Sequence, residues 1–214
     1  MGIAAIPIGV DVSRVKQVFG ARDRKLLDDF RTAPLYETYA SQTKDFDRLL
    51  EDIVCNYIQP ADRKEVRGLW GLGKPRVETG LQRNRADEYG YALLVICSYF
   101  GKQLMTSYDG FYYGRVWREM LELLKAEGLQ YNLEIMFEAP PQTTFDLPPR
   151  NDFPGIYVFS QEELMEVSSF LESRPHLFVE SEETDEELVE MLSDLRTSFS
   201  ECVQGGVQLL TFVH

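Results

Sequence analysis

The chain has 214 residues, of which 35 are acidic and 22 are basic, so its formal net charge is −13. Hydrophobic residues make up 44% and charged residues 27%, which is ordinary for a globular protein and excludes a disordered or fibrous one. Such an acidic chain repels a phosphate backbone, so we expect no nucleic-acid partner. The longest apolar stretch, residues 91–100, is about half of a membrane span, so we expect no membrane insertion.

Few residues of the types that catalyse reactions or bind metals are present. The two histidines are His176 and His214, and the three cysteines, Cys55, Cys97 and Cys202, form no CxxC pair. This pattern predicts no metal, no cofactor and no disulfide framework. Reduced cysteines and the lack of a signal peptide indicate a cytoplasmic protein, and the lack of a complete catalytic set argues against an enzyme.

The N-terminal part of the chain predicts one strand followed by helices. Residues 3–10 are typical of a strand, and Pro7 predicts that this strand lies at a sheet edge. Short helices are expected up to Gly20 and over residues 22–31. Residues 46–57 carry an apolar stripe at helical spacing that Pro60 ends. Residues 89–102 predict a buried helix, with a strand as the alternative.

The C-terminal part predicts three helices and two strands. A helix over residues 116–124 ends at Gly128, and residues 133–137 alternate like a strand. Ser160 with Glu163 forms a capping box that begins the next helix, and Thr184 with Glu187 repeats the pattern. The last helix carries an apolar stripe and ends at residues 205–206, and residues 207–213 predict a closing strand. The residues of the stripe are Leu188, Leu192, Leu195, Phe199 and Cys202. The expected fold is therefore α+β (mixed α/β), with several helices packed on one small sheet that includes the N- and C-terminal strands.

Charge and proline content divide the chain. Residues 151–214 hold 14 acidic and 2 basic residues, and residues 139–154 hold five of the ten prolines. Proline fixes φ and donates no hydrogen bond, so residues 139–154 predict an extended connector. Residues 155–214 form an acidic C-terminal subregion. A chain of this size that folds on its own can bury only a small hydrophobic core. We therefore expect a single domain over residues 1–214, in which this subregion returns to a shared sheet.

The most basic segment, residues 63–85, suggests an anion-binding loop. Residues 68–74 match the first seven positions of a phosphate-binding P-loop, but Pro75 offers no hydroxyl for magnesium and no apolar strand precedes the motif. We therefore expect a glycine-rich loop that binds no nucleotide. The segment still carries a net charge of +5. Three interpretations are open: these residues bind an anionic ligand, they pair with the acidic subregion, or they are only solvated loop charges. Its candidate anion-binding residues are Arg63, Arg67, Lys74, Arg76, Arg83 and Arg85.

An acidic run and a group of tyrosines are the candidate protein-binding features. Residues 180–190 include seven carboxylates, and only those of the first helical turn are explained by the helix dipole. A turn at Asp109-Gly110 predicts that neighbouring tyrosines are exposed, and exposed tyrosines are favoured interface anchors. The alternative for the acidic run is a solvated face. The alternative for the tyrosines is packing in the core. The candidate partner-binding residues are Glu180, Glu182, Glu183, Glu186, Glu187, Glu190, Tyr108, Tyr112 and Tyr113.

Short motifs at both ends of the chain point to a family. They are the opening strand followed by V-D-V-S-R-V (residues 10–15), D-F-P-G-I (residues 152–156) and the closing G-V-Q-L-L-T-F-V-H (residues 206–214). With these motifs the chain resembles an uncharacterised bacterial family of about this length, found in single-domain proteins. The resemblance implies no activity and assigns no role to any residue.

Two interpretations of function follow, and the oligomeric state is open in both. The first is an acidic cytoplasmic protein-binding domain, similar to an immunity or inhibitor protein that neutralises a basic partner such as a toxin. The second is an enzyme or small-ligand-binding domain that uses residues 63–85 for a phosphate- or carboxylate-bearing ligand. A structural subunit of a larger assembly is a third alternative.

Overall fold

The computed structural model describes residues 3–66, 76–104, 110–137, 144–148, 154–179 and 185–214. The chain divides into two compact units. The sheet unit contains residues 1–12, 100–144 and 152–214, and the helical unit contains residues 13–99 and 145–151. That the whole chain unfolds as a single domain stays a prediction.

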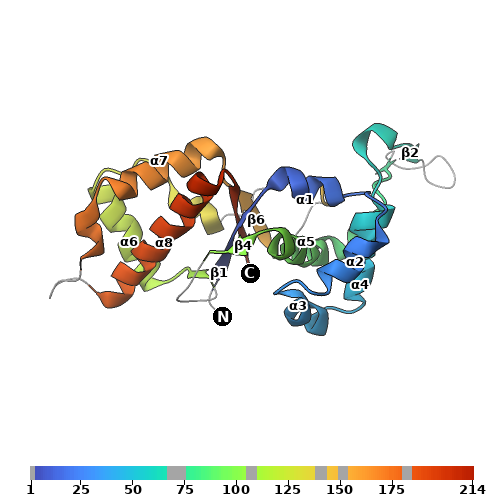
Figure 1. Cartoon of the computed structure of the whole chain (residues 1–214), viewed down its shortest axis with the longest axis horizontal. Helices are drawn as coiled ribbons and strands as arrows, with labels where there is room; N and C mark the ends of the chain where they lie inside the picture. The colour runs from blue at the N-terminus through green and yellow to red at the C-terminus, as the bar shows by residue number, and fades with distance from the viewer. Residues whose placement is uncertain (1–2, 67–75, 105–109, 138–143, 149–153, 180–184) are drawn as a thin grey trace. The chain divides into compact units, whose positions relative to one another are not determined.

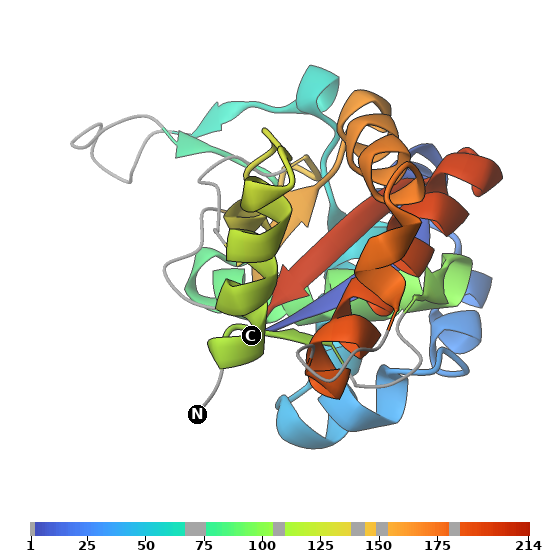
Figure 2. The ribbon, with the colours of Figure 1, turned by 90° about the vertical axis from the view of Figure 1, so that its left-hand side faces the viewer.

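The sheet unit is built on an antiparallel sheet with the strand order β4-β1-β7-β6, in which β5 also pairs with β1. The N-terminal and C-terminal strands are neighbours, in register from Ala5 opposite Val213 to Val10 opposite Gln208. This pairing confirms the predicted sheet (Figure 2). Its strands are β1 (Ala4–Val10), β4 (Lys102–Gln103), β5 (Phe111–Tyr112), β6 (Gly155–Val158) and β7 (Gln208–Val213).

The prediction that Pro7 places β1 at a sheet edge is wrong, because β1 lies between β7 and the two short strands β4 and β5. Ala4 and His214 exchange backbone hydrogen bonds. Hydrogen-bonded positions alternate along an antiparallel strand, so at Pro7, three residues further along β1, the backbone nitrogen and carbonyl point away from β7. On its other side the carbonyl of Pro7 accepts from the Leu104 N–H. β4 pairs with residues 8 and 9 and β5 with residues 4 and 5, so the position without an N–H falls between the two short strands.

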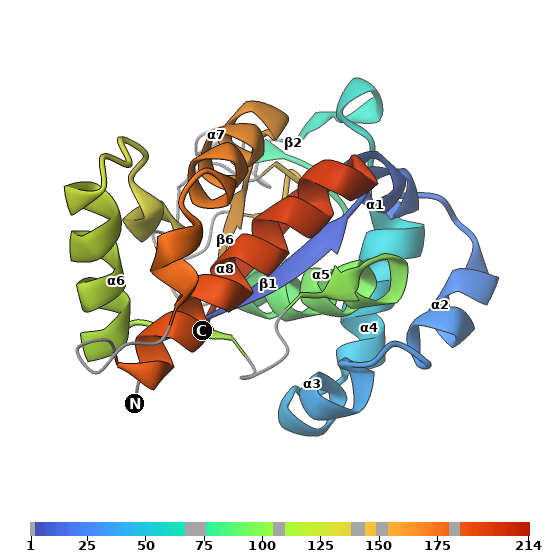
Figure 3. The same cartoon turned by 60° about the vertical axis from the view of Figure 1, so that its left-hand side comes forward.

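Three helices cover one face of this sheet (Figures 2 and 3). They are α6 (Arg115–Ala126), α7 (Gln161–Glu172) and α8 (Glu186–Gly205). The predicted apolar stripe of α8 is confirmed, because Leu192, Leu195, Phe199 and Cys202 are fully buried in the core of the sheet unit. Burial of one face of an amphipathic helix supplies most of its stability in a protein.

Local signals explain where these helices begin and end. Ser160 and Glu163 form the predicted capping box at the start of α7. The cap of α8 is instead Asp185, whose carboxylate accepts from the Glu187 N–H at 3.0 Å, so the prediction of a Thr184 cap is wrong. A carboxylate at this position satisfies an N–H and also interacts favourably with the helix dipole. Gly206, with φ of 61°, ends α8 as predicted.

The predicted strand over residues 133–137 is also wrong, because Leu133–Phe137 is a 3₁₀ helix, η4. The Asn132 side chain accepts from the Glu134 N–H at 3.0 Å, and this local bond begins a helical turn. Leu133 and Met136 are both buried, and their spacing of three residues puts them on one face of a 3₁₀ helix. A second such helix, η5 (Pro175–Phe178), follows α7.

The helical unit contains the α-helices labelled α1–α5 in Figure 1. These are α1 (Val12–Val18), α2 (Arg24–Phe30), α3 (Tyr36–Gln42), α4 (Phe46–Glu51) and α5 (Ala86–Phe100). The helix predicted over residues 89–102 is therefore confirmed up to Phe100, and the alternative of a strand is wrong for that stretch. The remaining elements are a π-helical turn η1 (Asp52–Asn56), the 3₁₀ turns η2 (Pro60–Asp62) and η3 (Arg83–Arg85), and the paired strands β2 (Glu65–Val66) and β3 (Arg76–Val77).

Candidate protein-binding surface

The N-terminal ends of α6 and α8 meet in the sheet unit (Figure 3). Arg115, the first residue of α6, donates hydrogen bonds to Asp185 at 3.1 Å and to Glu187 at 3.4 Å. It also donates to Glu119, one turn further along α6, at 2.9 Å. One exposed guanidinium therefore bridges three exposed carboxylates, and the group keeps a net charge of −2.

The positions of these residues follow from the physics of helix ends. Carboxylates at the start of α8 interact favourably with its positive end, so Asp185 and Glu187 are stable there without any partner. Arg115 is a cation at a helix N-terminus, where the dipole opposes it. Its three carboxylate partners compensate for this unfavourable position. Hydrogen bonds from Arg115 to Asp185 and Glu119 accordingly raise the pKa of the guanidinium.

Two of the predicted tyrosines lie in the segment that leads into α6. Tyr112 and Tyr113 come just before Gly114, the N-cap of α6, and they are 44% and 41% exposed. The Tyr113 N–H donates to the Ile3 carbonyl at 2.9 Å, and its ring contacts Phe137 with centroids 5.3 Å apart. The stem of Tyr113 is therefore held while part of its ring faces solvent.

The structure brings together two sets of residues that are far apart in the sequence. We call them the α6–α8 surface, which consists of Tyr112, Tyr113, Arg115, Glu119, Asp185, Glu186 and Glu187. Glu186 is exposed, whereas Glu190 is half-buried one turn further on. The other predicted partner-binding residues, Tyr108, Glu180, Glu182 and Glu183, lie outside the described residues.

The described members of the predicted anion-binding set lie in the helical unit. Arg63 donates to the Tyr57 hydroxyl at 2.9 Å and forms an ion pair with Asp146, and Arg85 forms an ion pair with Glu88. Burial raises the pKa of Asp146, but hydrogen bonds from Arg63 and Tyr57 outweigh it and hold this pKa below its ordinary value. Both arginines therefore have carboxylate partners within their own unit.

The other members of that set are less well defined. Arg83 is exposed, Arg76 is described only by its backbone in β3, and Arg67 and Lys74 lie outside the described residues with the whole P-loop-like segment 68–74. Anion binding by this set stays a prediction.

The described residues contain no group of three or more His, Cys, Asp or Glu side chains that could hold a metal ion. His176 is exposed, 3.2 Å from the Glu127 carboxylate. Burial raises the pKa of the Cys97 thiol above its ordinary value and that of Cys202 to about 12, so neither is an activated nucleophile. Among the helices that the structure describes, none is both long and apolar enough to cross a membrane.

Sequence reasoning missed Arg115 and Asp185, which connect the two predicted sets. The spacing of Arg115 and Glu119 indicates an ion pair within a helix, but nothing in the sequence indicates a contact across 70 residues. The pairing depends on α6 and α8 packing on the same face of the sheet.

The fold and this surface define an α+β protein that presents acidic and aromatic side chains together. The chain belongs to the family described as domain of unknown function DUF7691, whose model matches residues 1–214. This confirms the resemblance to an uncharacterised family. Searches of curated proteins and of solved structures found no match.

Proposed function

We propose that this protein is an acidic cytoplasmic binding domain that docks on a basic protein through the α6–α8 surface, as an immunity or inhibitor protein does. The observation that carries the proposal is that two exposed tyrosines lie two and three residues before Arg115, which bridges the carboxylates of α6 and α8. Interfaces use tyrosines as anchors and complementary charges for steering and specificity.

The two kinds of side chain have different roles in this proposal. Tyr112 and Tyr113 are large and stiff, and burying them against a partner slows dissociation. The carboxylates are exposed, so they act mainly on the association rate through their negative field, which salt screens. Arg115 offsets only part of that field, and Glu186 adds to it.

The test begins with identification of the partner by pull-down from the native cell. Reversal of Glu182, Glu183, Glu186 and Glu187 to lysine is then expected to slow association at low salt by about one to two orders of magnitude. Only a small loss of thermal stability is expected, because the Glu186 and Glu187 side chains are exposed, although the reversal removes their favourable interaction with the start of α8 and the ion pair of Glu187 with Arg115. Tyr112→Ala with Tyr113→Ala is expected to accelerate dissociation instead.

A matched control carries the same kind of charge change elsewhere. Glu162 and Glu166 are exposed on α7, and their reversal to lysine is expected to slow association much less than reversal at the start of α8. If the α8 variant binds at the wild-type rate in low salt, the acidic run is only a solvated face. If the α7 control slows association equally, the association rate depends on the net charge of the whole protein and not on the α6–α8 surface.

A further inference from the structure

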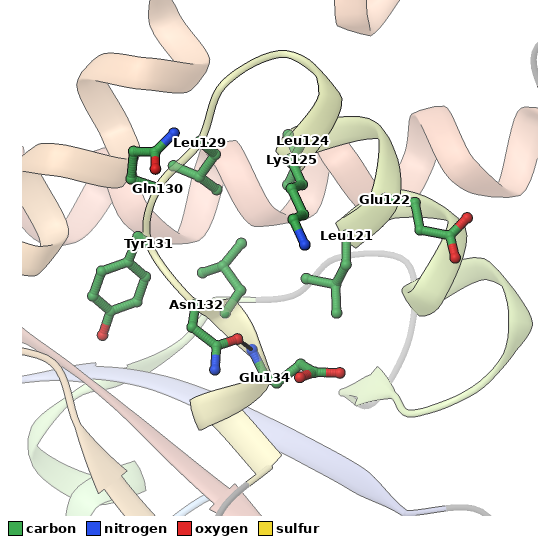
Figure 4. Close-up of a pocket in the computed structure, with 10 residues that line it drawn as sticks. Leu121, Glu122, Leu124, Lys125, Leu129, Gln130, Tyr131, Asn132 and Glu134 are labelled. Atoms are coloured by element: carbon green, nitrogen blue, oxygen red, sulfur yellow. Dashed lines mark hydrogen bonds between the residues drawn. The ribbon is translucent and has the colours of Figure 1, made fainter.

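A cavity of about 590 Å³ lies in the sheet unit between the C-terminal half of α6 and the start of η4 (Figure 4). Its apolar side is formed by Leu121, Leu124, Leu129 and Leu133. The last three are buried, so the floor belongs to the core of the sheet unit. Small-molecule sites have this size and an apolar lining with a few polar groups, about 300–1,000 Å³.

Two side chains that line the cavity, Lys125 and Asn132, have hydrogen-bond donors that no described residue uses. Lys125 extends from α6 toward the space between Leu121 and Asn132 (Figure 4), and among the described residues its side-chain ammonium has no ion-pair or hydrogen-bond partner. Asn132 uses its carbonyl oxygen to accept from the Glu134 N–H at 3.0 Å. Its amide nitrogen therefore keeps two donors for a ligand. An ammonium and a side-chain amide are together suited to a carboxylate.

A carboxylate lies beside Asn132, across the cavity from Lys125 (Figure 4). Glu134 belongs to the first turn of η4, and its side chain pairs with no described cation. Glu122 adds a second carboxylate to the lining, so Lys125 is outnumbered and the site does not favour a simple anion. A ligand that carries a carboxylate and an ammonium group close together satisfies Asn132 and Glu134, which are neighbours, and its carboxylate can also face Lys125.

The wall of the cavity is fixed by contacts from other elements. The Tyr131 hydroxyl donates to the Glu163 carboxylate at 2.7 Å, and its ring packs against Phe159 with centroids 6.1 Å apart. Glu163 is itself held by the capping box of α7. A wall ordered before binding lowers the conformational entropy that the protein loses when a ligand binds, so even a small ligand can bind measurably.

We propose that this cavity binds a small zwitterion with an apolar body, of the class of the aliphatic α-amino acids. The carboxylate of the ligand contacts Lys125 and Asn132, its ammonium contacts Glu134, and its side chain lies on the leucine floor. This site is independent of the α6–α8 surface and of the proposed protein partner.

The test is an NMR titration of the full-length ¹⁵N-labelled protein with three probes of similar shape. L-leucine carries both charges, 4-methylpentanoate lacks the ammonium and 3-methylbutylamine lacks the carboxylate. We expect L-leucine to shift the amides of residues 121–134 and to bind at least about tenfold more tightly than either single-charge probe. Lys125→Gln and Glu134→Gln are each expected to weaken L-leucine binding by about tenfold.

Controls separate the site from nonspecific charge effects. Lys25→Gln removes an exposed lysine in the helical unit and is expected to leave the affinity unchanged. Glu134→Gln is expected to leave 4-methylpentanoate binding unchanged or tighter, since that probe has no ammonium. The proposal is overturned if no probe shifts residues 121–134, if 4-methylpentanoate binds as tightly as L-leucine, or if Lys125→Gln keeps the wild-type affinity.

Discussion

The Tyr131 hydroxyl donates to the Glu163 carboxylate across 32 residues of sequence, at 2.7 Å. The same carboxylate oxygen accepts from the Tyr157 hydroxyl at 2.8 Å, and the other oxygen accepts from the Ser160 N–H at 2.6 Å. A capping box thus also connects α7 to β6 and to the loop before η4. Burial raises the pKa of Glu163, but hydrogen bonds from Ser160, Tyr131 and Tyr157 outweigh it and hold this pKa below its ordinary value.

Replacement of Glu163 is expected to destabilise the fold in a pH-dependent way. Glu163→Gln should lower the free energy of unfolding by about 1–2 kcal/mol at pH 7, because an amide accepts more weakly and has only one oxygen, whereas the carboxylate uses one oxygen for the two tyrosines and the other for the Ser160 N–H. The pKa of Glu163 is lowered by folding, so its stabilisation is complete above the ordinary carboxyl pKa of 4.5. It is lost as the pH falls through the lowered value.

Urea unfolding of both proteins at pH 7 and at a series of acidic pH values measures this difference. Glu166→Gln on the exposed side of α7 is the control, and it should unfold like the wild type. A Glu163→Gln deficit that stays constant down to pH 2 would contradict the assignment.

The buried carboxylate of Asp52 should matter more. Asp52 is 2% exposed, accepts from Tyr89 at 2.8 Å and from Gln82 at 2.9 Å, and forms an ion pair with Arg48 at 3.2 Å. Asp52→Asn keeps the shape but turns a donor toward these donors, so we expect a loss of about 3 kcal/mol in the free energy of unfolding. Glu37→Gln, on the exposed side of α3, is the control. Equal denaturation midpoints for both variants would refute this prediction.

Two glycines are expected to respond very differently to the same change. A Cβ on Gly80 would lie 1.9 Å from the Asn56 carbonyl oxygen, and its φ of +77° is itself unfavourable for alanine. A Cβ on Gly114 would meet nothing within 4 Å. Gly80→Ala should therefore cost more than about 2 kcal/mol and Gly114→Ala less than about 1 kcal/mol, as measured by thermal unfolding. Similar melting temperatures for the two variants would show that the turn at Gly80 relaxes.

The acidic subregion should not fold alone. β7 pairs with β1 along six residue pairs, and α8 packs in the same core as Trp117 and Met120 of α6. A fragment of residues 155–214 loses both, so we expect no dispersed NMR spectrum and no cooperative transition in circular dichroism. A cooperative transition of this fragment would show that β6, α7, α8 and β7 suffice for a fold.

Local interactions were predictable because each involves residues within one turn or one helix. The Ser160–Glu163 box, the glycine that ends α8 and the buried stripe of α8 all appear where the sequence pattern predicts them. The exposure of Tyr112 and Tyr113 next to a turn was predictable for the same reason. The site roles assigned to these residues stay predictions.

The α+β class, the ends of most helices and the return of the last strand to the sheet could be predicted from the residues alone, since periodicity and capping are local properties. Tertiary packing placed Pro7 inside the sheet, because the cost of a missing N–H depends on which neighbour faces it. It also decided that residues 133–137 form a 3₁₀ helix and that Arg115 contacts Asp185. Such contacts depend on how distant segments pack, and no local pattern encodes them.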